Sequence, residues 1–354
     1  MKKMTKLVLA SLGIIVFLGA CSNQSESNNS ISTNEESTST ASSEMNSMEG
    51  MNHEGMVPSS MKDAANPKFP VGSNVILLGD HMEGMKGANA QVDGGSIELT
   101  GTNGQGVRGY RESLTRLENV DITITGNSGK GIVAETDATI NFIGGDMNII
   151  GSDSYGVKAS GAISTKTATN IENSIITMDG LYNYGAFMES YGGGAGAISL
   201  KNSEIKMLKD SSYGLFSTGA GATIKASDVA ILLTKQSSDG IQAKAGGVVE
   251  ISDRLIVKYD GAVGTAINSI GNGSKVQGTS RMYVLGNMKA SDSGVVDLTM
   301  TDGSVFIGTA QQTDGKVTLN MLSGSKWYAT GNNDLDHRLE DGSFLYLGAP
   351  PVAN

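Results

Sequence analysis

Ser-Tyr-Gly-Val at residues 154–157 returns as Asn-Tyr-Gly-Ala at 183–186 and as Ser-Tyr-Gly-Leu at 212–215. Each return comes 29 residues after the previous one. Weaker copies of the phrase begin at Gly106, Gly131, Gly240 and Gly264. From the first to the last of these glycines, the phrase recurs every 24 to 29 residues. A period of this length with no helical pattern inside it is typical of a solenoid of strands.

Each repeat contains three short segments in which apolar and polar residues alternate. Examples are Asp-Ile-Thr-Ile at 121–124, Gly-Ile-Val-Ala at 131–134 and Ala-Thr-Ile-Asn-Phe at 138–142. Such alternation indicates strands with one buried face, and Gly-Gly, Asn-Ser and Asp-Gly turns separate them. Three strands in each turn predict an all-β fold, a three-sided parallel β-helix over residues 95–335. We expect right-handed winding, because parallel crossovers almost always take that hand.

Equivalent positions of successive coils should form columns. Tyr155, Tyr184 and Tyr213 precede the repeat glycine in three successive coils, so they should lie ~4.8 Å apart along one edge. Our main interpretation is structural, because stacked rings stabilise the corner of a coil. The alternative is that the three tyrosines present an aromatic strip to a sugar chain, which makes them candidate ligand-binding residues.

The composition excludes several classes of function. The chain has 354 residues, a net charge of −10 and no stripe of Lys and Arg, so it is not expected to bind nucleic acid. Cys21 is its single cysteine, which excludes an internal disulfide and a cysteine-based zinc site.

The first 20 residues are predicted to be a lipoprotein signal peptide. Three lysines lie among the first six residues, and an apolar run follows from 7 to 18. That run is shorter than the ~20 residues needed to span a bilayer. Leu-Gly-Ala-Cys at 18–21 resembles the bacterial lipobox, which implies cleavage before Cys21 and a lipid on its sulfur. The protein is therefore expected to be secreted and anchored at the bacterial envelope, facing outward; the alternative is an ordinary signal peptide with an incidental cysteine.

Residues 21–60 are predicted to form a disordered acidic tether. From residue 22 onward this segment has six Glu and no Lys or Arg, and such a composition buries too little apolar surface to fold. Thioethers and imidazole favour Cu(I), so a second hypothesis is copper binding here; otherwise the segment is a plain linker and no cofactor is expected. The candidate metal ligands are Met45, Met48, Met51, His53, Met56, His81, Met82 and Met85.

The stretch from residue 51 to about 93 carries a family resemblance. It includes His-Glu-Gly at 53–55, Asn-Pro-Lys-Phe at 66–69 and Asp-His-Met-Glu-Gly-Met-Lys-Gly-Ala at 80–88. These residues resemble the YdhK-type lipoproteins of Gram-positive bacteria, which implies an envelope location and contact with a metal. We expect residues 61–94 to be a YdhK-like fragment that also caps the start of the solenoid.

The end of the repeats carries a second resemblance. Trp327 is followed by Thr-Gly at 330–331, and this stretch is similar to the end of pertactin-like autotransporter passengers. The resemblance implies a β-helix that contacts surfaces, although no segments for a translocator barrel follow it in this chain. Residues 336–354, with His337, are expected to form a C-terminal cap.

An enzymatic role is the remaining alternative. Some β-helices are polysaccharide lyases or hydrolases, in which carboxylates from adjacent coils meet. The acids considered were Asp121, Glu135, Asp137, Glu189, Glu204, Asp228, Glu250 and Asp253. They do not recur at one coil position beside a base, so the sequence favours a non-enzyme. We expect an adhesin-like surface protein that binds a surface, matrix or host ligand, such as a glycan.

Overall fold

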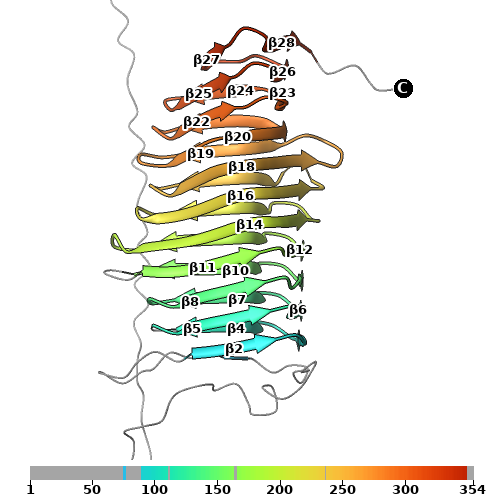
Figure 1. The fold of residues 1–354 in the computed structure, drawn as a ribbon, viewed down its shortest axis with the longest axis vertical. Helices are drawn as coiled ribbons and strands as arrows, with labels where there is room; N and C mark the ends of the chain where they lie inside the picture. The colour runs from blue at the N-terminus through green and yellow to red at the C-terminus, as the bar shows by residue number, and fades with distance from the viewer. Residues whose placement is uncertain (1–74, 77–88, 111, 163–165, 236, 349–354) are drawn as a thin grey trace, which may run out of the picture. The chain divides into compact units, whose positions relative to one another are not determined.

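The computed structural model describes residues 75–76, 89–110, 112–162, 166–235 and 237–348. The described strands form a parallel β-solenoid of about nine turns (Figure 1), which confirms the predicted fold. All the described strands belong to one compact unit. Within the described ranges, no helix is long and apolar enough to cross a membrane. Residues 1–60, for which the sequence predicts a signal peptide and a tether, lie outside the described residues.

The first face of the solenoid is a ten-stranded parallel sheet. Each of its strands pairs with the equivalent strand of the next coil. Its strands are β1 (Val75–Ile76), β4 (Gln105–Tyr110), β7 (Lys130–Glu135), β10 (Tyr155–Gly161), β13 (Tyr184–Ser190), β15 (Tyr213–Thr218), β17 (Asp239–Lys244), β19 (Thr265–Ile270), β21 (Asn287–Ser291) and β24 (Ala310–Thr313).

The second and third faces are joined into one sheet, because four strands bend from one face to the other. Strands confined to the second face are β2 (Asn89–Asp93), β5 (Leu114–Glu118), β8 (Thr139–Ile143), β11 (Lys166–Glu172), β22 (Val295–Met300), β25 (Lys316–Met321) and β27 (Asp336–Leu339). Those confined to the third are β3 (Ser96–Thr100), β6 (Asp121–Thr125), β9 (Met147–Ile150), β12 (Ile175–Asp179), β23 (Val305–Gly308), β26 (Lys326–Ala329) and β28 (Phe344–Leu347). The bent strands are β14 (Ala195–Met207), β16 (Ala222–Leu233), β18 (Val248–Tyr259) and β20 (Lys275–Leu285).

Asparagine sets the bend between the second and third faces in two adjacent coils. Asn173 and Asn202 have φ values of 55° and 46°, in the left-handed region that asparagine tolerates better than most residues. The Asn202 amide donates a 2.7 Å hydrogen bond to the Asn173 side-chain oxygen. The corner is therefore stabilised from coil to coil.

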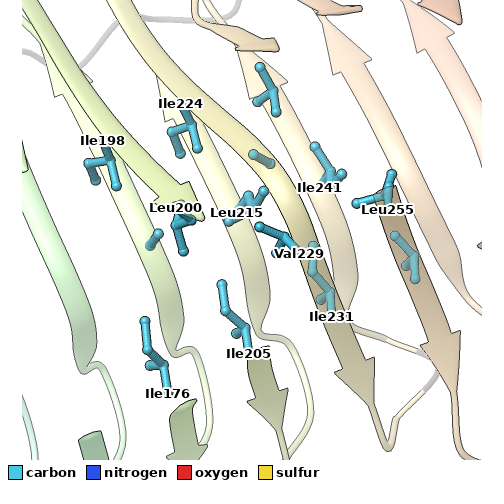
Figure 2. Packing of buried hydrophobic residues seen from close by; sticks show 14 of the residues in the cluster. Ile176, Ile198, Leu200, Ile205, Leu215, Ile224, Val229, Ile231, Ile241 and Leu255 are labelled. Carbon is cyan, nitrogen blue, oxygen red and sulfur yellow. The ribbon is translucent and has the colours of Figure 1, made fainter. Parts of the chain in front are cut away.

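The core consists of inward-facing columns of apolar residues. Ile176, Ile205 and Ile231 pair in register on β12, β14 and β16, and all three are fully buried (Figure 2). Toward the C-terminal end the same column reaches Phe306 and Trp327, whose rings stack with centroids 5.5 Å apart. Like residues therefore stack on like residues inside the solenoid, as the repeat predicts.

The repeat glycine is needed because two neighbours occupy the space of a side chain. A Cβ built at Gly185 would lie 2.7 Å from the Gly214 carbonyl oxygen of the next coil and 2.5 Å from Cγ2 of Ile205. Gly156 and Gly214 have the same two kinds of neighbour at 2.5–2.6 Å. Glycine thus allows successive coils to approach each other beside the isoleucine column.

The assignment of Gly264 to this glycine column is wrong. Ile241 pairs with Ile267, so Ala266 stands opposite Gly240, and Gly264 lies in the turn before β19. The ladder to the next coil shifts register at this point: Thr265 pairs with Asn287 and Ile267 with Met288. Ala266 is thereby left without an opposite residue, which makes room for its methyl group.

The two segments that were predicted to be caps contain regular strands of the solenoid. Within residues 61–94, β1 pairs with β4 and β2 pairs with β5, so the first coil begins here. Within residues 336–354, β27 continues the second face and β28 continues the third. The described part of both segments therefore extends the stack of coils.

Candidate functional site

The three repeat tyrosines form a ladder on the outside of the first face. Tyr155, Tyr184 and Tyr213 begin β10, β13 and β15 and pair in register. Their ring centroids are 5.1 and 5.2 Å apart, and the planes differ by only 9° and 13°. The predicted column and its spacing are confirmed.

A second aromatic column lies beside the ladder. Phe187 and Phe216 each follow a ladder tyrosine by three residues, and their rings stack at 5.4 Å. Each packs edge-on against the tyrosines, with Phe187 at 4.9 Å from Tyr184 and Phe216 at 5.0 Å from Tyr213. Neither belongs to the core inside the coils, although both are buried by this packing. The five rings form one cluster, which we call the aromatic cluster.

Most ring faces of the ladder are already covered. Tyr184 has a tyrosine ring on each side, and the Lys158 ammonium lies 5.3 Å from the centre of the Tyr155 ring. A sugar that stacks on an aromatic ring needs an open face. The ladder therefore offers mainly ring edges to a ligand, and ligand binding by these three tyrosines stays a prediction.

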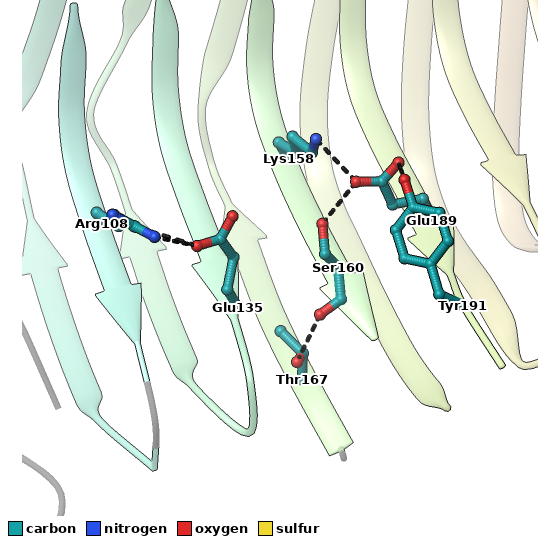
Figure 3. Close-up of polar contacts among 7 residues, drawn as sticks. All are labelled: Arg108, Glu135, Lys158, Ser160, Thr167, Glu189 and Tyr191. Carbon is teal, nitrogen blue, oxygen red and sulfur yellow. Dashed lines mark hydrogen bonds and ion pairs between the residues drawn. The ribbon is translucent and has the colours of Figure 1, made fainter. Parts of the chain in front are cut away.

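A buried carboxylate borders the aromatic cluster. Glu189 in β13 is 8% exposed and accepts hydrogen bonds from Lys158 Nζ at 2.7 Å, from Ser160 Oγ at 2.8 Å and from the Tyr191 hydroxyl (Figure 3). Burial alone would raise the pKa of Glu189, but the hydrogen bonds from these three donors outweigh it and hold that pKa below its usual value. The bond to Glu189 in turn raises the pKa of Tyr191 to about 12.

Cationic side chains gather on the N-terminal side of the cluster. Arg108 Nη2 lies 2.6 Å from a Glu135 carboxylate oxygen (Figure 3). Lys130 precedes Tyr155 in the ladder column, and its pKa is lowered by burial and by the nearby charges of Lys158 and Arg108. This end of the face therefore holds three cations and one paired carboxylate besides Glu189.

A second carboxylate closes the C-terminal side. Asp239 follows Tyr213 in the ladder column and accepts hydrogen bonds from Gln242 Nε2 at 3.0 Å and Asn268 Nδ2 at 3.2 Å. Burial raises the pKa of Asp239 above its usual value. The aromatic cluster is thus bordered by hydrogen-bonding and charged groups at both ends.

The other acids considered from the sequence are dispersed over the molecule. Glu204 lies 3.6 Å from Lys206, Asp228 lies 2.6 Å from Arg254, and Glu250 lies 3.8 Å from Lys225. Asp121 and Asp137 each accept a hydrogen bond from a backbone N–H group, and Asp253 accepts one from the Ser227 hydroxyl. Asp228 and Arg254 line a groove of about 310 Å³ at the corner of the second and third faces, away from the aromatic cluster.

The metal-ligand hypothesis falls on residues that the structure does not describe. Met45 to Met56 and His81 to Met85 lie in undescribed segments, as does Cys21. Within the described ranges, no group of three or more His, Cys, Asp or Glu side chains is placed to hold a metal ion. His337 lies in β27, where its ring packs edge-on to Trp327 at 5.9 Å.

Comparison with known proteins supports only the N-terminal resemblance. Residues 71–100 match a family described as "Protein of unknown function (DUF1541)". Over 54 residues the chain is 44% identical to an uncharacterized protein, YdhK, from Bacillus subtilis (strain 168). This match covers 14% of the chain and 26% of YdhK. It confirms a partial, distant similarity to YdhK and assigns no activity to the solenoid.

The second aromatic column was missed in the sequence, although a signal for it was present. Phenylalanine stands three residues after the tyrosine in two successive repeats, at Phe187 and Phe216, and Lys158 has the same position one coil earlier. An apolar residue in a short strand is normally assigned to the core. Only the register between coils shows that this column faces outward.

Proposed function

We propose that this protein is a lipid-anchored, outward-facing binding protein of the bacterial envelope, adhesin-like and without catalytic activity. Its ligand is an extended surface, matrix or host molecule, a glycan chain in the first instance, held against the first face. The observation that carries the proposal is the aromatic cluster with its bordering Lys158–Glu189 pair, arranged as a rigid patch on an open sheet. The resemblance of the repeats and of the Trp327 region to pertactin-like passengers, which rests on the sequence, also supports surface binding.

Two features of the patch favour binding over catalysis. The side chains are held by one another across coils, so a ligand would order few of them on binding. Glu189 is kept charged by three donors, whereas a general acid at neutral pH needs a raised pKa. Ring edges, tyrosine hydroxyls and ion pairs along one face suit hydrogen bonding to the hydroxyl groups of an extended chain.

The test separates ligand contact from folding. Tyr155→Phe, Tyr184→Phe and Tyr213→Phe combined keep the stacked rings but remove three hydroxyls. Residues 22–354 and this triple variant are compared on a glycan array and on matrix proteins. We expect unchanged stability and a loss of affinity of roughly ten- to a thousandfold, because each of the three lost hydrogen bonds contributes ~0.5–1.5 kcal/mol.

A matched control makes the same chemical change on the third face. Tyr283→Phe, Tyr328→Phe and Tyr346→Phe combined should leave ligand binding unchanged. If both triple variants bind as the unmodified chain does, the ladder does not contact the ligand. If the unmodified chain binds none of the glycans or matrix proteins, the proposed function is wrong.

Anchoring is tested separately from ligand binding. Cys21→Ala removes the only cysteine, so the protein should be released into the medium or remain unprocessed. Normal processing with retention in the membrane fraction would contradict the lipobox interpretation.

A further inference from the structure

The outer side of the third face changes character along the stack. Two of the outward columns on this face hold nine strand positions from β3 to β14, of which eight are polar and three are acidic. They are Ser96, Glu98, Asp121, Thr123, Asn148, Ile175, Thr177, Glu204 and Lys206. This is the ordinary solvated surface of a sheet with one buried face.

The same two columns become apolar from β16 onward, where Ala230 and Leu232 occupy them. Of the ten outward positions described from β18 to β28, eight carry apolar or aromatic side chains and none carries an acid. We call the eight the apolar strip: Ile256, Tyr283, Leu285, Val305, Ile307, Tyr328, Phe344 and Tyr346. The strands β23, β26 and β28 that carry most of it lie one above another near the C-terminal end (Figure 1).

The apolar strip is accessible to solvent and internally ordered. Tyr283, Phe344 and Tyr346 are 37%, 48% and 41% exposed. Tyr328 and Tyr346 stack with centroids 4.7 Å apart, and Phe344 lies 6.2 Å from Tyr346. The remaining two outward positions are Lys258 and Lys326, both exposed. The surface is therefore apolar and aromatic, with two cations and no carboxylate in its columns.

The size of the strip argues against a stable contact with a second copy. It spans five coils and two outward residues, about 20 Å by 7 Å between backbone atoms. Even with the breadth of the side chains it covers roughly 400 Å², about half of the ~800 Å² per partner that a standard protein–protein interface buries. A lipid bilayer has no such minimum, since a surface can insert as far as its apolar side chains reach.

We propose that the apolar strip docks on a lipid bilayer that contains anionic headgroups. Tyrosine and lysine are the residues that proteins place at the membrane interface, and aliphatic side chains between them insert at the boundary of headgroups and acyl chains. The whole chain carries a net charge of −10, so attraction to anionic lipid has to come from local cations, and the two columns of the strip hold no acid. Lys258 and Lys326 supply that attraction.

The test uses residues 22–354, which keep every described strand and lack the leader and Cys21, so that neither can bind lipid. The protein is sedimented with phosphatidylcholine vesicles, with and without phosphatidylglycerol. We expect binding that increases with phosphatidylglycerol. Ile256→Thr, Tyr283→Ser and Ile307→Thr combined should reduce the bound fraction about tenfold or more, because membrane affinity scales with buried apolar area.

Two further variants sharpen the result. Ile150→Thr, Ile175→Thr and Tyr182→Ser combined make the same changes at half-buried or exposed positions outside the strip and should bind like the unmodified chain. Lys258→Gln with Lys326→Gln should keep the binding to phosphatidylcholine and lose the gain from phosphatidylglycerol. If circular dichroism shows that the strip variant is unfolded, the lysine pair alone decides the proposal.

Several outcomes would overturn the proposal. If the strip variant and the unmodified chain sediment equally with vesicles, the strip does not touch lipid. Alternatively, the unmodified chain forms a dimer that the strip variant loses, and neither binds vesicles; the strip then contacts a second copy. A lysine-pair variant that keeps its full response to phosphatidylglycerol also contradicts the assigned role of the two cations. Loss of glycan binding by the ladder variant is independent of all three results.

Discussion

The isoleucine column and the tyrosine ladder belong to the same three coils but lie on opposite sides of the backbone. Ile176, Ile205 and Ile231 are enclosed by the three faces, whereas the ladder tyrosines stand outside the first face and are only half-buried. The glycine after each tyrosine separates the two columns and contacts the isoleucine of its own coil. Both columns repeat with the spacing of the coils.

The difference teaches which contacts hold the fold and which remain free for other uses. The isoleucines stabilise the fold because they are removed from water, so these positions have to remain buried and apolar. The ladder is stabilised mainly by ring against ring, a smaller contribution of ~0.5–1.5 kcal/mol per pair. An outward column with modest stabilising energy can be altered for binding without loss of the solenoid.

The largest expected effect comes from the inner column. Ile205→Ala leaves a cavity between two isoleucines that the rigid coils cannot close, and should lower the free energy of unfolding by about 3–4 kcal/mol. Denaturant midpoints of residues 22–354 measure it. A loss of less than about 1 kcal/mol would mean that the coils relax around the cavity.

The second-largest loss of stability is expected from a substitution at the glycine between the columns. Gly185→Ala places a methyl group 2.7 Å from the Gly214 carbonyl oxygen and 2.5 Å from Ile205 Cγ2, and should cost about 2–3 kcal/mol. In the Ile205→Ala background one of these clashes disappears, so the same change should cost less. Strictly additive costs in this double-mutant cycle would contradict the contact between the two columns.

The outer ladder should show a smaller and graded effect. Tyr184→Ala removes two ring–ring stacks, whereas Tyr155→Ala or Tyr213→Ala removes one, so Tyr184→Ala should lower stability most, by ~1–3 kcal/mol. Lys206→Ala, at an outward polar position, should stay within about 0.5 kcal/mol. Equal midpoints for all three tyrosine variants and the unmodified chain would reverse our view that the ladder also supports the fold.

The smallest effect concerns the carboxylate beside the ladder, and it depends on pH. Because the pKa of Glu189 is held below its ordinary value of 4.5, its charge stabilises the fold fully above that value, and the contribution is lost as pH falls below it. Glu189→Gln should therefore cost about 1 kcal/mol at neutral pH. The gap between variant and unmodified chain should narrow in unfolding experiments at pH 3. A constant gap would mean that Glu189 acts through shape and not through charge.

The repeat allowed much of the fold to be predicted from the sequence. In three successive coils a tyrosine before the repeat glycine marks equivalent positions directly, so the ladder follows from the spacing of Tyr155, Tyr184 and Tyr213 alone. Alternating apolar residues likewise identify the inward columns. These features are local, since each can be recognised within a single coil and then repeated.

What could not be predicted depends on how one coil is aligned with the next. Gly264 looked like a repeat glycine, but the ladder places Ala266 in that column. The outward position of Phe187 and of the apolar strip could not be predicted from a single coil, because outward and inward apolar side chains differ only in register. The ion pair of Lys158 with Glu189 joins residues of two coils, so the sequence of neither coil alone predicts it.

The ladder bonds of the solenoid run from coil to coil, along the direction of the stack, and this determines how the molecule responds to force. When the chain is held at its N-terminus and pulled through a ligand on the tyrosine ladder, only the coils between β1 and β15 carry the tension. Their ladders are loaded in series, so the weakest coil separates first. One coil of 25 to 29 residues releases on the order of 90 Å of chain. The solenoid would therefore lengthen in steps under load, while the coils beyond the ladder stay folded.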